Sequence, residues 1–103
     1  MRSNPLYVTT KVGLHAEPAM FFLKIANEFE SEIWIEKNEH KVNVKSLLGI
    51  LSLNIQNKDH IIVVAEGSDE GHAVEAISEL LQTGFDDCEE YYRKWKPFFS
   101  TKS

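Results

Sequence analysis

The sequence predicts an α+β fold, a mostly antiparallel four-stranded sheet with three helices on one face. Segments with strand-like alternation and segments with helical periodicity follow one another in the order strand, helix, strand, strand, helix, strand, helix. Two adjacent strands are joined by a short turn, which makes them an antiparallel hairpin. A chain of 103 residues with 43% hydrophobic residues can build one core but is short for two domains. One layer of helices packed on one sheet would bury the apolar side of each helix and of each strand.

The first strand and the first helix are predicted from local spacing. Residues 6–10 alternate between the two sides of a strand, which begins after Pro5. Residues 17–29 form an amphipathic helix, because apolar residues recur there at intervals of three and four. Pro18 suits the first turn of this helix, where its missing N–H is not needed.

The centre of the chain reads as a hairpin. Apolar and polar residues alternate in residues 33–36 and again in residues 41–44. The turn residues Asn38 and Glu39 stand between these two runs. The sequence therefore predicts the second and third strands here.

The second half continues with a helix, a strand and a helix. Ser46 is a good N-cap for the short apolar helix over residues 47–53. Residues 60–65, HIIVVA, form a strand that is apolar on both sides. Residues 68–70 offer a cap and first-turn acids for the last helix of the body, and Gly84 is placed to end it.

The last 21 residues differ from the rest in composition. Residues 1–82 carry the whole net charge of −5, whereas residues 83–103 hold four basic and four acidic side chains and are neutral. We call residues 83–103 the C-terminal extension and residues 1–82 the body domain. The extension holds six of the eleven aromatic residues of the chain, namely Phe85, Tyr91, Tyr92, Trp95, Phe98 and Phe99.

The extension is predicted to form a helix over residues 86–96 and to cover the open face of the sheet. Asp86 can cap such a helix and Pro97 can end it. The aromatic stripe of the helix would pack on the sheet of its own chain or of a partner in a symmetric homodimer. The apolar patch that it would bury comprises Tyr7, Trp34, Ile62 and Val64.

Composition excludes several classes of function. With 11 basic and 16 acidic side chains, the chain is not expected to bind nucleic acid or anionic lipid directly. It has no apolar run long enough for membrane insertion and no secretory signal, so we expect a cytoplasmic protein. Cys88 is the single cysteine, and the four histidines are scattered, so no disulfide framework, metal site or cofactor is predicted. The expected partners are proteins.

Two candidate sites lie at predicted helix starts. His15 precedes the first helix, where free backbone N–H groups and the helix dipole would favour a phosphoryl group on its ring. Ser46 caps the second helix, where a phosphate would also be tolerated. Taken alone, each residue fits an ordinary cap or surface role better than a functional one.

Three motifs together carry a family resemblance. Residues 13–19, GLHAEPA, resemble the motif G-[LI]-H-A-R-P-A of HPr, the histidine-containing phosphocarrier of the bacterial phosphoenolpyruvate:sugar phosphotransferase system. Residues 45–53, KSLLGILSL, resemble the regulatory-serine segment of the Gram-positive members. Residues 65–70, AEGSDE, resemble the entry to their last helix. The resemblance extends over residues 6–82 and implies the open-faced β-sandwich of HPr.

The resemblance implies a phosphoacceptor and binding module rather than an enzyme that turns over a substrate. His15 would accept phosphate from the first enzyme of the system and pass it to the sugar-specific components. Ser46 would be phosphorylated by the ATP-dependent HPr kinase/phosphorylase. The serine-phosphorylated form would then act as corepressor for a LacI-type catabolite regulator.

The resemblance also implies a partner surface. The leucines of residues 47–53 lie nearly all round a short helix, so some of them must be exposed beside the two phosphoacceptors. Ala16 and Glu17 would surround the phosphate. The partner-binding residues implied are Met20, Lys24, Lys45, Leu47, Leu48 and Leu51.

Glu17 stands where the family has arginine. A carboxylate at this position would repel a phosphoryl group, so His15 would be a poor acceptor or would be served by a more basic partner. Three alternatives remain open: a phosphocarrier acting through His15, a regulatory paralogue acting mainly through Ser46 in catabolite repression, and a binding module without phosphorylation.

Overall fold

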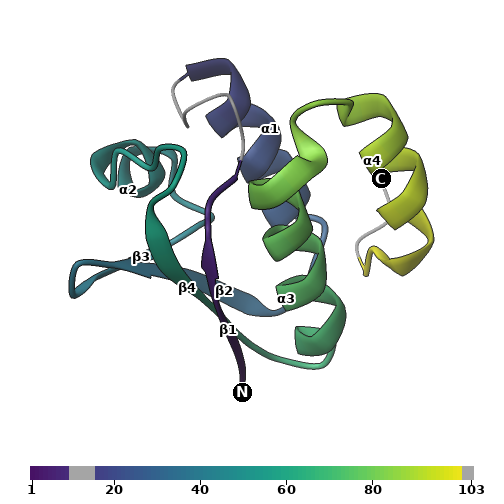
Figure 1. Ribbon diagram of the computed structural model, residues 1–103. Helices are drawn as coiled ribbons and strands as arrows, with labels where there is room; N and C mark the ends of the chain where they lie inside the picture. The colour runs from purple at the N-terminus through teal and green to yellow at the C-terminus, as the bar shows by residue number, and fades with distance from the viewer. Residues whose placement is uncertain (10–15, 101–103) are drawn as a thin grey trace.

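Four strands form a single sheet in the order β1-β4-β2-β3, and each neighbouring pair is antiparallel (Figure 1). The structure is a computed structural model. It describes residues 1–9 and 16–100, with the backbone alone for residues 16, 17 and 84. The elements in chain order are β1 (Arg2–Tyr7), α1 (Ala16–Ala26), β2 (Glu32–Lys37), β3 (His40–Asn43), α2 (Leu47–Ser52), β4 (His60–Glu66), α3 (Glu70–Glu79), the π-helical turn η1 (Leu80–Gly84), α4 (Cys88–Trp95) and the 3-10 turn η2 (Lys96–Phe98).

The two faces of the sheet differ in burial, because successive side chains of a strand point to opposite faces. Ile61, Val63 and Ala65 alternate along β4, so they share one face of the sheet, and all three are fully buried under the helices. On the open face, Val64 is paired with Trp34 of β2 in the register of the sheet. The α+β class predicted from the sequence, with an open face opposite the helices, is confirmed.

Two element ends differ from the prediction. β1 begins at Arg2 and includes Pro5, which lies opposite Ile62 of β4. An edge strand tolerates a proline, because one side of such a strand has no ladder to complete. α1 ends at Ala26, and tighter turns follow, with the Phe29 amide donating to the Ala26 carbonyl. These turns keep Phe29 in the core, so the helical spacing of apolar residues extends beyond the helix.

The hairpin between β2 and β3 turns through two residues in the left-handed region. The φ angles are 51° at Asn38 and 71° at Glu39. Lys37 and His40 form the last pair of the ladder on either side. Two successive positive φ angles are typical of the type I′ turn, whose twist matches that of the flanking strands.

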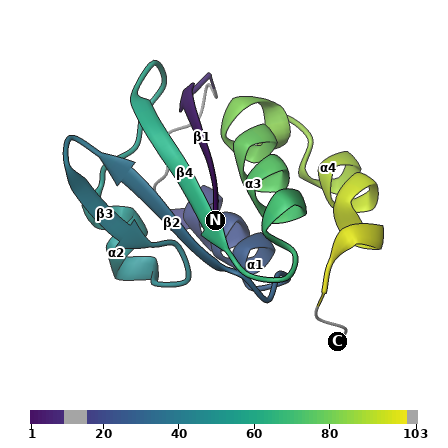
Figure 2. The same ribbon diagram turned by 90° about the horizontal axis from the view of Figure 1, so that it is seen from below.

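The prediction that the C-terminal extension covers the open sheet face is wrong. α4 forms within the expected range, but it lies beside α3 on the side away from the strands (Figure 2). The Tyr91 hydroxyl donates to the Ala76 carbonyl of α3 at 2.6 Å. Phe99 packs edge-on against Phe29, with ring centroids 5.4 Å apart. The aromatic residues of the extension thus pack against α3 and the turn after α1.

The short link before α4 explains this placement. α3 continues through η1, and only residues 85–87 separate η1 from α4. Three residues span about 10 Å at most, which is about the diameter of one helix. The link therefore reaches the outer side of α3 but not the far face of the sheet. Tyr7 remains 63% exposed on that face.

The division of the chain at residue 82 stays a prediction, because η1 crosses this position without a break. Through the ranges that the structure describes, no helix has the length and apolar character needed to cross a membrane.

Candidate functional site

Ser46 is held at the start of α2 by the turn that follows β3. The Asn43 side chain accepts from the Lys45 amide at 2.8 Å, and the Asn43 carbonyl accepts from the Ser46 amide at 3.2 Å. The Ser46 hydroxyl oxygen then accepts from the Gly49 amide at 3.2 Å, and its carbonyl accepts from the Ile50 amide at 3.0 Å. Ser46 is extended, with φ −110° and ψ 116°, which is the N-cap geometry. The predicted cap is confirmed.

Gly49 lies next to the Ser46 hydroxyl, and its position has room for a methyl group only at contact distance. A Cβ at this position would lie 3.4 Å from the Ser46 Oγ and equally close to the Cβ of Val42. Gly49 is not among the residues predicted from the sequence to form the site. The signal for it is a glycine three residues after a capping serine, inside an otherwise apolar helix.

An exposed apolar surface lies beside Ser46. Leu48 is 80% exposed, Met20 54% and Leu51 36%, and Leu47 is half-buried. Ile50 is fully buried and holds α2 onto the core. Exposed leucines and methionine at this density are typical of a protein-docking site. We call Met20, Leu47, Leu48 and Leu51 the docking surface.

The two lysines predicted to bind partners point in different directions. The Lys24 ammonium lies over the ring of Tyr92 in α4, 4.9 Å from the ring centroid. The Lys45 ammonium donates to the Phe29 carbonyl at 3.0 Å, in the turn after α1. The structure thus brings Lys24 to the C-terminal extension and Lys45 to the end of the first helix.

His15 lies outside the described residues. Ala16 and Glu17 are the first two residues of α1, so the helix begins one residue before its predicted start. The roles of these three residues stay predictions. The structure describes the side chains of Ser46, of the docking surface and of Lys24 and Lys45.

Asp69, which the sequence predicts only as part of a helix start, accepts hydrogen bonds from two distant parts of the chain. It occupies the N-cap position of α3 but makes no side-chain bond to its own helix. Its carboxylate accepts hydrogen bonds from the amides of Glu30 and Ser31, each at 2.9 Å, and from the hydroxyls of Ser31 and Ser100. Asp69 therefore joins the turn after α1, the start of α3 and the end of the C-terminal extension.

The hydrogen bonds that Asp69 accepts lower the pKa of its carboxyl group. Partial burial acts to raise the pKa of Asp69, but the bonds from Ser100, Ser31 and the Glu30 amide outweigh it, so the pKa lies below its ordinary value. In α4, burial raises the pKa of Tyr91 far above its ordinary value, so its hydroxyl stays a donor to Ala76. Across residues 1–9 and 16–100, no three His, Cys, Asp or Glu side chains come together as a metal-binding group.

Comparisons with known proteins agree with the geometry. The family model described as the PTS HPr component phosphorylation site matches residues 3–83. The HPr-like protein Crh of Halalkalibacterium halodurans is 45% identical over 82 residues, which cover 80% of this chain and 98% of that protein. The crystal structure of HPr from Thermoanaerobacter tengcongensis superposes with a TM-score of 0.78 at 39% identity, covering 84% of this chain and 98% of that one.

One further match concerns assembly. The crystal structure of Crh from Bacillus subtilis, described as a catabolite repression protein that forms a dimer with a swapped domain, matches with a TM-score of 0.63 at 37% identity. The match covers 74% of this chain and 87% of that chain. The family model ends at residue 83, so nearly all of the C-terminal extension lies beyond it.

Proposed function

The chain belongs to the HPr family of phosphocarrier proteins, and from this premise we propose that it is a regulatory docking protein in which Ser46 is the phosphoacceptor. One observation carries the proposal: the exposed Ser46 hydroxyl caps α2 directly beside the exposed leucines of the docking surface. The apolar surface would bind a partner protein, and phosphorylation of Ser46 would determine which partner binds.

Phosphorylation of Ser46 would change the charge of this surface and keep its shape. A phosphoserine carries about −1.5 to −2 charges at neutral pH. At the first turn of a helix a negative charge is stabilised by roughly 0.3–1 kcal/mol, so the helix would survive the modification. A partner that reads both the leucines and the phosphate would therefore distinguish two forms of one folded protein.

The proposed partners of this site come from the family resemblance and from the relatives named Crh. HPr kinase/phosphorylase would phosphorylate Ser46 with ATP, and a LacI-type catabolite regulator in the cytoplasm would bind the product. The relatives named Crh support this choice, since Crh of Bacillus subtilis is described as a catabolite repression protein. A homodimer stays a prediction. We expect it to form through the open sheet face, because the aromatic stripe of the extension packs against α1 and α3 of its own chain.

Kinase labelling tests the regulatory role. With purified HPr kinase/phosphorylase and ATP, we expect about one phosphate per chain, mapped to Ser46 by mass spectrometry. Ser46→Ala should abolish the labelling. Ser52→Ala is the matched control, because Ser52 is an exposed serine of the same helix whose hydroxyl donates to the Gly49 carbonyl. An unlabelled natural chain, or equal labelling of Ser46→Ala, would show that Ser46 is not the phosphoacceptor.

A second candidate function is phosphate transfer through His15. Residues 13–19 carry the HPr motif and lie inside the range matched by the phosphorylation-site model. Glu17 opposes this function: two unit charges 4 Å apart repel by about 1 kcal/mol in water and about 4 kcal/mol at an effective dielectric of 20. We therefore propose, as this second function, that His15 accepts phosphate slowly.

Reversing the charge at position 17 tests this second function. With phosphoenolpyruvate and the first enzyme of the phosphotransferase system, we expect slow, acid-labile labelling of His15 and at least about tenfold faster labelling of Glu17→Arg, from about 1.4 kcal/mol of relieved repulsion. Glu75→Arg is the control, because it makes the same charge change on the exposed side of α3. Fast stoichiometric labelling of the natural chain would refute the inhibition by Glu17. If neither chain is labelled, the second function is refuted, and Ser46 is the only phosphoacceptor that remains proposed.

A further inference from the structure

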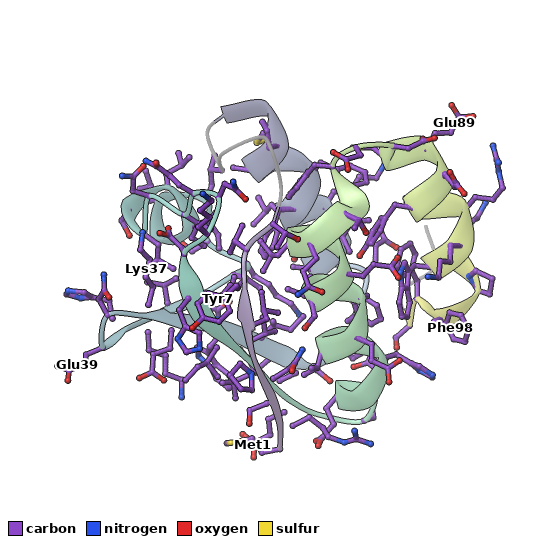
Figure 3. All side chains as sticks on the ribbon, viewed as in Figure 1. Met1, Tyr7, Lys37, Glu39, Glu89 and Phe98 are labelled. Atoms are coloured by element: carbon purple, nitrogen blue, oxygen red, sulfur yellow. The ribbon has the colours of Figure 1, made fainter. Side chains whose placement is uncertain are left out.

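The last turn of α2 is held by a lysine of the sheet. Lys37 is the last residue of β2, and its ammonium donates to the carbonyls of Leu53 and Asn54, each at 2.9 Å (Figure 3). The last carbonyls of a helix have no amide partner within the helix, and the negative end of the helix dipole favours a positive charge. Lys37 therefore caps the end of α2 from outside the helix.

The same ammonium is paired with the residue that precedes β4. It lies 2.7 Å from the Asp59 carboxylate, which also accepts from the Gln56 amide at 2.8 Å. Partial burial acts to raise the pKa of Asp59, but these bonds outweigh it, so the pKa lies below its ordinary value. An ammonium has three N–H donors, and Lys37 directs them to Asp59 and to the two carbonyls of α2. Its side chain is only 16% exposed, so Lys37 is a fixed link between the sheet and α2.

A helix as short as α2 depends on such external contacts. Of its six described residues, Ile50 is the one that is buried. Directly after the helix, the side chain of Leu53 enters the core, and the chain turns at Asn54 with a φ angle of 48°, in the left-handed region. Isolated helices of this length are not stable in water, so the contacts at its ends determine where α2 lies. Lys37 supplies the contact for the backbone at the C-terminal end.

The two ends of α2 serve different parts of the site. Leu48 and Leu51 of the docking surface lie one turn apart, and the Leu51 carbonyl accepts from the Asn54 amide at 3.2 Å in the last turn. A shift of this last turn therefore moves the exposed leucines. Ser46 lies at the opposite end, where the turn after β3 holds it. The support of the leucines is thus separate from the support of the serine.

We propose that Lys37 is a positioning residue of the docking surface, which holds the end of α2 on the sheet so that the leucines are presented to the kinase in one arrangement. This inference rests on the proposed function. When the arrangement that binds is populated only in part, the apparent affinity for a partner falls by that fraction. Without Lys37, Leu51 samples several positions, so the kinase binds more weakly. Transfer of phosphate to Ser46 in the bound complex proceeds as before.

Lys37→Met in the full chain tests the inference, because methionine keeps an unbranched apolar side chain and removes the ammonium. Phosphorylation of Ser46 by purified HPr kinase/phosphorylase and ATP is followed at increasing concentrations of the chain. We expect KM to rise about three- to tenfold, which corresponds to a positioned end of α2 in roughly a third to a tenth of the molecules. The value of kcat should stay within about twofold, because the lost interaction acts on binding alone.

Three further variants control for charge and for folding. Lys37→Arg keeps a positive charge and several N–H donors, so its KM should stay within about twofold of that of the natural chain. Lys41→Met removes the same charge from the neighbouring strand, where the Lys41 ammonium lies 4.8 Å from the ring centroid of Trp34, and should change neither constant. Asp59→Asn leaves the bonds from Lys37 to α2 in place and should raise KM by a smaller factor than Lys37→Met. It replaces Lys37→Met in the assay if a thermal unfolding scan shows that the latter does not fold.

Hydrogen exchange gives a readout that does not involve the kinase. The amides of Leu53 and Asn54 close the last turn of α2, so they should exchange faster in Lys37→Met than in the natural chain. The Gly49 amide at the start of α2 should exchange at the same rate in both chains, because its support does not depend on Lys37.

The possible results separate this inference from the function on which it rests. An unchanged KM of Lys37→Met, a loss of kcat in place of the rise in KM, an equal effect of Lys41→Met, or unchanged exchange at the end of α2 would overturn the positioning by Lys37. Absence of ATP-dependent labelling of the natural chain would overturn the proposed function instead, and the exchange measurement would still decide whether Lys37 holds α2.

Discussion

Trp95→Ala is expected to release α4 from α3 and to lower the free energy of unfolding by about 3 kcal/mol, toward the low end of values for buried aromatic residues. Trp95 is only 6% exposed. Its ring packs against Phe98 and Tyr91, with centroid distances of 5.5 and 6.5 Å. Alanine would leave a cavity between α3 and the extension that these neighbours cannot fill.

Chemical denaturation and hydrogen exchange measure this effect. Exchange should show residues 85–100 losing protection first, while β2 and β4 stay protected, because the extension packs on α1, on α3 and on the turn after α1. Trp95→Phe should cost less, about 1 kcal/mol from the lost hydrogen bond together with a small volume change. Arg93→Ala is the control, because the Arg93 side chain of the same helix is 74% exposed. A Trp95→Ala chain with unchanged stability and full protection of α4 would contradict the packing described for the extension.

The parts of the fold that local patterns determine could be predicted from the sequence. Alternation put Ile61, Val63 and Ala65 on one face of their strand, and a capping serine before an apolar run placed the start of α2. Each of these features depends on residues within a few positions of one another. The order of the strands across the sheet, β1-β4-β2-β3, does not follow from local spacing alone.

The position of the C-terminal extension could not be predicted in this way. Its helical period identified an aromatic stripe, but both the open sheet face and the flank of α1 and α3 offered apolar surface to it. The length of the link after η1 decided between them, and that length is known only once η1 is seen to continue to Gly84. The contact of Lys24 with Tyr92 follows from the same placement.

Contacts between distant residues were missed for a related reason. Asp69 stands at a helix start, where its sequence context indicates a simple cap. Its hydroxyl partners Ser31 and Ser100 are 38 and 31 positions away along the chain. No periodicity links such positions, so the structure alone reveals that one carboxylate joins them.

Asp69→Asn should therefore destabilise the protein strongly. We expect a loss of about 1–3 kcal/mol in the free energy of unfolding at neutral pH. Hydrogen bonds to a charged group contribute about 1.5–3 kcal/mol, and the amide keeps one acceptor oxygen while it turns an N–H₂ group toward other donors. The backbone amides of Glu30 and Ser31 and the hydroxyl of Ser100 would compete for that oxygen. Asp86→Asn, at an exposed position, is the matched control and should change stability by less than about 0.5 kcal/mol.

The pH dependence of this loss gives a second test. The pKa of Asp69 is lower in the folded protein than its ordinary value, so the unfolded chain binds this proton more readily than the folded one. The stabilisation is then fully present above the ordinary pKa of an aspartate, about 4, and is lost as the pH falls through the lower folded pKa. The stability difference between the natural chain and Asp69→Asn should shrink in denaturation curves recorded at successively lower pH below about 4. A difference that stays constant down to about pH 2 would mean that the charge on Asp69 does not hold the extension to the body, and that its hydrogen bonds act only through their geometry.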